Sequence, residues 1–94
     1  MPSNSQTGFF TGSQGAARRA RVDWLLAHRH LWIDIKLGTK PSIHEHFMQS
    51  GFEVAKAMKD AGLFSATTYV NDIRWARYVR AAQVELRKLT ESAQ

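Results

Sequence analysis

Residues 75–89 read WARYVRAAQVELRKL and carry the most regular apolar spacing in the chain. The apolar positions alternate between intervals of four and three residues, as they do along one face of an α-helix. The stripe consists of Trp75, Val79, Ala82, Leu86 and Leu89, and it is broadened towards the N-terminus by Tyr69, Ile73 and Ala76. We therefore expect a helix that starts near Ser65, ends near Leu89 and turns this face towards the core.

Upstream of this helix, the sequence twice shows the form of a capping box, in which a Ser is followed three residues later by a Glu. The two boxes run from Ser42 to Glu45 and from Ser50 to Glu53. They predict either two short helices, over about 43–49 and 52–61, or one helix kinked near Gly51, and we favour two. Gly62 is expected to end the second helix, because glycine readily adopts the left-handed conformation found at helix C-termini.

The N-terminal part divides into segments of different composition. Residues 1–15 contain no charged residue and little to bury, which predicts a flexible tail. Residues 16–30 are helix formers with apolar residues at helical spacing, which predicts a helix. Residues 31–37 alternate between apolar and polar, with Ile33, Ile35 and Leu37 on one face, so we expect a short strand or an extended arm there.

Length and composition restrict the class of protein. The chain has 94 residues, which is enough for one domain over residues 16–94, and it contains no cysteine for disulfides or thiolate metal sites. No stretch approaches the roughly 18 apolar residues of a membrane span, and we expect a cytoplasmic protein that does not bind membranes. The expected fold is all-α, with three or four helices. The formal charge of +5 favours a polyanionic partner.

Residues 54–63 and 65–73 read VAKAMKDAGL and SATTYVNDI, and they resemble a helix-turn-helix unit. In that motif a short helix ends in a Gly-centred turn, an apolar residue follows, and a second helix begins with Ser or Thr. The resemblance extends over a segment of about 52–80 and includes winged-helix proteins. It implies a non-catalytic protein that binds double-stranded DNA and regulates transcription or replication in the bacterial or phage manner. The second helix, from about Ser65, would enter the major groove.

A helical wheel of residues 66–89 identifies the face that would contact DNA. Its members are Thr67, Val70, Asn71, Arg74 and Arg77. Arg74 and Asn71 are expected to bond base edges, since Arg can pair with guanine and Asn with adenine. Phosphate contacts are expected from Arg77 and from Lys56, Lys59, Arg18, Arg19 and Arg21. A polar face of this kind equally suits a helix surface that only contacts water, and the Arg cluster equally suits solubility.

The histidines form two H-x-H pairs, His28 with His30 and His44 with His46. Two residues apart on a helix, side chains diverge by about 200° and do not close a metal site. No catalytic or phosphate-binding motif is found, so we predict no enzyme activity, no cofactor and no metal.

Two further expectations concern partners. A homodimer would bind two DNA half-sites, with Leu86 and Leu89 at the contact between its two copies, which we call the seam. The alternative function is a protein-interaction adaptor or inhibitor that uses Phe9 and Phe10, or a Trp-rich surface, to bind a protein. An exposed Trp24 or Trp32 would favour this alternative, whereas a continuous positive face around Arg74 would favour DNA.

Overall fold

The structure is a computed structural model that describes the backbone of residues 2–38 and 48–93 and the side chains of residues 15–38 and 48–92. Within these residues every regular element is helical, and no strand occurs, so the expected all-α fold is confirmed. The elements are α1 (Pro2–Ala27), the 3₁₀ turn η1 (Arg29–Leu31), α3 (Gln49–Asp60), the 3₁₀ turn η2 (Val70–Asp72) and α4 (Trp75–Ala93).

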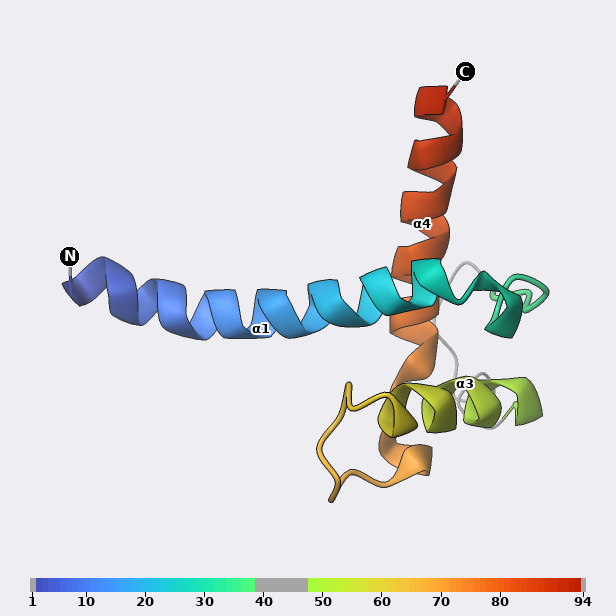
Figure 1. The fold of residues 1–94 in the computed structure, drawn as a ribbon, viewed down its shortest axis with the longest axis horizontal. Coiled ribbons are helices and arrows are strands. Elements are labelled where there is room, and N and C mark those ends of the chain that lie inside the picture. The colour runs from blue at the N-terminus through green and yellow to red at the C-terminus, as the bar shows by residue number, and fades with distance from the viewer. Residues whose placement is uncertain (1, 39–47, 94) are drawn as a thin grey trace.

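The helices form a cross rather than a bundle (Figure 1). α4 crosses α1 near the C-terminal end of α1, and the first turns of α4 also pack against α3. The far ends of α1 and α4 extend beyond this crossing, which gives the molecule extents of 45 × 42 × 25 Å. Among the described residues, no helix is long and apolar enough to cross a membrane.

The core lies where the three helices meet. α1 contributes Val22 and Leu25, one helical turn apart, and α3 contributes Val54, Ala55 and Met58. The core also receives side chains from α4 and from the residues just before it, namely Ile73, Trp75, Ala76, Val79 and Ala82. The stripe expected on residues 75–86 is therefore confirmed, with Leu86 half-buried at its edge. Leu89 and Tyr69 were expected in the same stripe, but they are 59% and 71% exposed because one lies past the crossing and the other in a loop.

Trp75 packs directly against the backbone of α3 at Gly51. A Cβ added to Gly51 would lie closer than 3.0 Å to three atoms of the Trp75 indole. The indole is only 1% exposed, and within the described residues its N–H has no hydrogen-bond partner. Gly51 is therefore required inside α3 by the bulk of the ring.

The start of α3 differs from the prediction. The helix begins at Gln49 with Met48 as its N-cap, so Ser50 is not the cap that the second capping box predicts. Ser50 and Gly51 lie inside the helix instead, where the missing side chain of Gly51 makes room for the Trp75 indole. The other expected helix, over 43–49, and its capping box fall almost wholly outside the described residues.

The N-terminal helix is longer than predicted at one end and shorter at the other. α1 starts at Pro2, so it includes residues 2–15, for which the composition predicts a flexible tail. A helix that has nucleated grows at little cost per residue, and this allows residues of modest helix propensity to join it. α1 ends at Ala27, before the predicted end at His30.

After α1 the chain turns instead of forming a strand. Trp32, 1% exposed, donates its indole N–H to the Leu25 carbonyl at 2.7 Å and closes the end of α1. Ile33 is 50% exposed, whereas Ile35 is buried, so the predicted common face of Ile33 and Ile35 is wrong. Residues 35–38 have no regular structure and correspond to the extended arm that was the other prediction.

Candidate nucleic-acid interface

The end of α3 follows the predicted turn chemistry. Gly62 has φ of +82°, its N–H donates to the Lys59 carbonyl at 2.9 Å, and the Leu63 N–H donates to the Met58 carbonyl at 3.1 Å. These two bonds define a Schellman motif, which satisfies carbonyls that the helix leaves unpaired. The role assigned to Gly62 is confirmed.

The recognition helix expected from Ser65 is absent. Residues 63–74 form a loop with the short turn η2, and α4 begins only at Trp75. The Ser65 hydroxyl accepts from the Thr67 N–H at 3.2 Å, and the Ser65 carbonyl accepts from the Thr68 N–H at 3.0 Å. Such local bonds compete with helix formation, and the β-branched residues that follow add to the effect. The two helices are thus separated by a loop much longer than a helix-turn-helix turn.

The predicted DNA-reading residues are consequently distributed over two elements. Thr67, Asn71 and Arg74 lie exposed on the loop, whereas Val70 is half-buried against the core. Arg77 is exposed on the first turn of α4. The loop also presents Tyr69, which the prediction had assigned to the core.

Of the four arginines assigned to phosphate, namely Arg18, Arg19, Arg21 and Arg77, two make structural contacts instead: Arg19 and Arg21. Arg21 stacks on the Phe64 ring at 4.1 Å and lies 5.3 Å from the centre of the Tyr78 ring. It also donates to the Leu63 carbonyl at 3.0 Å and to the Tyr78 hydroxyl at 2.9 Å. This half-buried side chain joins α1, the loop and α4, and it is committed to holding them together.

Arg19 forms ion pairs with both Glu85 of α4 and Asp23 of α1. Its second contact with Glu85, from Nη2 to Oε2, measures 2.6 Å. Hydrogen bonding to Glu85 and then to Asp23 raises the pKa of Arg19. The pKa of Glu85 is lowered, first by its hydrogen bond to Arg19 and further by the nearby positive charges of Lys88 and Arg18.

This ion pair determines the charge of α4. Glu85 is the single acid among residues 75–90, which also contain four cations, Arg77, Arg80, Arg87 and Lys88. At 100° per residue these cations lie within about 100° of arc, opposite the apolar stripe. We call these four residues the basic face of α4. Arg18 of α1 is exposed and acts on the same carboxylate as Lys88, so it lies beside this face.

Arg80, Arg87 and Lys88 were not among the predicted site residues. The wheel of residues 66–89 spans these positions, but only Lys88, about 20° from Arg77, falls within the predicted face; Arg80 and Arg87 lie about 60° and 80° away on the other side of Arg77. The lysines predicted on α3 lie elsewhere on the surface: Lys56 is exposed and Lys59 is half-buried.

Two further kinds of site were considered in the sequence, a metal site at the histidine pairs and a protein-binding surface rich in tryptophan. His28 stacks on Trp24 with ring centroids 4.1 Å apart, and its Nδ1 lies 2.7 Å from the Trp24 carbonyl. In the described part of the chain no three potential ligands gather as a metal site would require, and His44 and His46 lie outside it. Trp32 and Trp75 are buried and Trp24 is half-buried, so the described residues form no Trp-rich surface. The side chains of Phe9 and Phe10 are not among those described.

Comparisons of this chain with known protein families, with curated proteins and with solved structures found no match. The arguments for function therefore come from the residues themselves.

Proposed function

We propose that this chain binds double-stranded DNA without catalysis and acts in the cytoplasm as a small regulator of transcription or replication of the bacterial or phage kind. The observation that carries the proposal is the basic face of α4. Among residues 75–90 the single acid, Glu85, is paired with Arg19, and the other four charged side chains of this stretch are all cations. Phosphates are the commonest target of such a surface.

The dimensions of this face suit a duplex. From Arg77 to Lys88 a helix rises about 16 Å, and each nucleotide of one DNA strand advances its phosphate by about 3.4 Å along the duplex axis. Arg77, Arg87 and Lys88 can therefore contact successive phosphates, with α4 lying in or along the major groove, whereas Arg80 bonds the Gly38 carbonyl. The outer half of α4 extends beyond the helix crossing, which leaves room for DNA to approach (Figure 1).

Sequence reading is proposed for the loop before α4. Arg74 and Asn71 are exposed there, three and six residues ahead of Arg77, and both side chains can form paired bonds to base edges. Thr67 supplies a further hydroxyl for a phosphate or a thymine methyl contact. Lys56 and Lys59 on α3 are proposed as secondary phosphate contacts.

A homodimer would double the number of base pairs read. Of the two leucines expected at its seam, Leu86 packs against the core and Leu89 is exposed on the outer part of α4. We therefore propose Leu89 as the contact between copies, a point that sedimentation of wild type and Leu89→Ser would decide.

The test is a fluorescence titration of labelled duplex DNA at about 50 and 200 mM salt. If Arg77, Arg87 and Lys88 each contact a phosphate, affinity should fall about fortyfold between these concentrations. Lys88→Ala should weaken binding to every sequence alike and lower the salt slope by about 1. Arg74→Ala should cost more on a selected site than on random DNA, by about 1–3 kcal/mol.

The matched control is Arg29→Ala, which removes the same charge from an exposed residue of η1, outside α4. Its salt slope should equal that of the wild type. Equal losses from Arg29→Ala and Lys88→Ala would mean that net charge alone is responsible and that α4 is not the interface. Absence of salt-dependent binding to any duplex would refute the function itself.

A further inference from the structure

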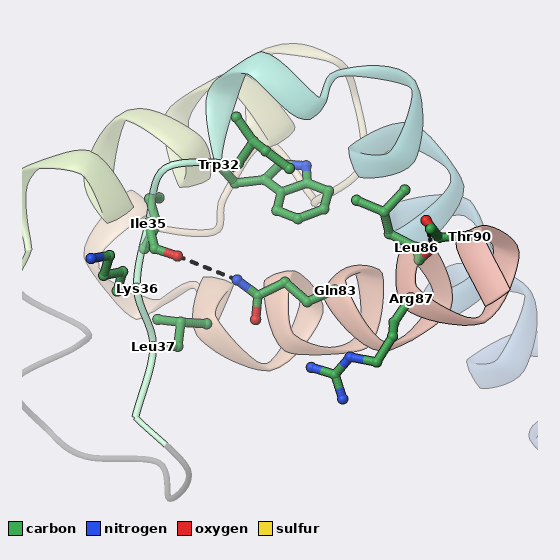
Figure 2. A pocket seen from close by; sticks show the side chains of 9 residues that line it. Trp32, Ile35, Lys36, Leu37, Gln83, Leu86, Arg87 and Thr90 are labelled. Atoms are coloured by element: carbon green, nitrogen blue, oxygen red, sulfur yellow. Dashed lines mark hydrogen bonds between the residues drawn. The ribbon is translucent and has the colours of Figure 1, made fainter.

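A groove of about 530 Å³ lies on the side of α4 that faces residues 32–37 (Figure 2). One wall is the irregular segment that follows η1, and the other is the stretch of α4 around Gln83, Leu86 and Thr90. Trp32 forms the floor, and it is almost completely covered by its neighbours. Of the residues proposed to contact DNA, Arg87 alone is among the residues that line this groove.

Two side chains of α4 hold the irregular segment, which forms one wall of the groove, in place. Arg80 donates to the Gly38 carbonyl, with Nη2 2.9 Å from the oxygen, and Gln83 donates its amide N–H to the Ile35 carbonyl at 3.3 Å. Two side chains one turn apart thus hold the backbone of residues 35–38 alongside the helix. The groove is therefore formed before any partner binds, which reduces the entropy lost on binding.

The lining combines an apolar interior with positive edges. Ile35, Leu37 and Leu86 supply the apolar part, and Ile33 adds a side chain that is 50% exposed. Lys36 and Arg87 lie on opposite sides, one on each wall (Figure 2). No acidic side chain occurs among the lining residues.

We propose that this groove binds an acidic, amphipathic segment of a partner protein. Apolar side chains of the segment would occupy the space above Trp32, and carboxylates on both sides of them would pair with Lys36 and Arg87. Charge complementarity of this kind selects the partner and speeds its association. The groove is open to solvent rather than enclosed, which suits a peptide better than a small molecule, because small ligands are usually enclosed over most of their surface.

The experiment uses the full chain and a panel of labelled peptides about 12 residues long, in which Glu residues flank Leu or Phe at helical spacing. Two matched panels replace Glu by Lys, or Leu and Phe by Ser. We expect saturable binding of the acidic amphipathic panel alone. In a nitrogen-15 spectrum the indole N–H signal of Trp32 should move on binding, whereas that of Trp75 should not.

Two pairs of variants locate the binding. Lys36→Glu should weaken binding about tenfold, whereas Lys56→Glu, the same change on α3, should leave it unaltered apart from the effect of net charge. Ile33→Ser should weaken it similarly, whereas Val84→Ser, at a comparably exposed apolar residue outside the groove, should not. Both substituted groove positions lie outside the basic face of α4, so DNA binding reports separately on the proposed function.

Several outcomes would overturn the proposal. Equal binding of the Lys-containing panel, equal effects within either pair of variants, or no binding by any peptide at about 1 mM would each do so. A concentration-dependent dimer that Ile33→Ser disrupts would assign the groove to a second copy of this chain instead.

Discussion

Gly51→Ala should destabilise the protein, although the same change in most helices is stabilising. Inside a helix, alanine is favoured over glycine by about 0.5–1 kcal/mol. At Gly51 the added Cβ would overlap three atoms of the Trp75 indole, and a ring only 1% exposed has no free space into which to rotate. Overpacking of a core costs about 1–3 kcal/mol, and this rigid contact belongs at the upper end.

The net loss is therefore about 2 kcal/mol, which in a domain of this size lowers the melting temperature by about 8–16 °C. Circular dichroism during heating and urea titration would both measure it. Two other glycines serve as controls. Gly15→Ala, where the Cβ meets no atom within 4 Å, should be neutral or slightly stabilising. Gly62→Ala also meets open space, but its φ of +82° should cost about 1–2 kcal/mol.

A Gly51→Ala variant as stable as the wild type would show that Trp75 does not pack on α3 as described. The orientation of α4 relative to α3 would then be wrong, and with it the direction of the basic face. The comparison with Gly15→Ala is needed because it separates the intrinsic helix preference from the contact with the indole.

Further predictions concern the core and the two arginines. Trp75→Ala should lower the free energy of unfolding by about 3–5 kcal/mol. Trp75→Phe should lower it much less, because it removes the unpaired indole N–H, whose burial costs about 1–3 kcal/mol. Equal losses of stability for the two variants in urea titrations would contradict this. Arg21→Lys should lower the free energy of unfolding by about 1–2 kcal/mol, because an ammonium cannot stack flat on Phe64 while it bonds Tyr78. Unchanged stability would mean that the stacking of Arg21 on Phe64 contributes nothing. The lowered pKa of Glu85 means that its ion pair stabilises the fold above the ordinary value of 4.5 and that this contribution is lost as the pH falls below it. Glu85→Gln should therefore show a shallower loss of melting temperature on acidification than the wild type, and identical pH profiles would refute the pair.

The sequence was most informative where one kind of interaction dominates. The spacing from Trp75 to Leu86 reports burial against two other helices, and the structure follows it. Gly62 likewise ends its helix as predicted, because left-handed backbone at a helix end is a local property of the residue.

Elsewhere a local signal was overridden by a contact distant in sequence. Ser50 has the pattern of an N-cap, yet it lies inside α3, next to the glycine that packs against Trp75 from far along the chain. Arg19 and Arg21 look like free cations in the sequence, since Glu85 and Tyr78 are more than fifty residues away. The apolar spacing also extended through Tyr69 and Ile73 and concealed the loop, because a wheel cannot register the local bonds of Ser65.

The contacts of Arg21 have a consequence for the rates of folding and unfolding. Its guanidinium bonds Leu63 and Tyr78, which are 42 and 57 residues away, so the contact forms only when three separate segments have come together. Closing such long loops costs chain entropy, and where a contact forms only after the transition state, its loss accelerates unfolding and leaves folding almost unchanged. Arg21 would then determine the rate of unfolding and have little effect on the rate of folding.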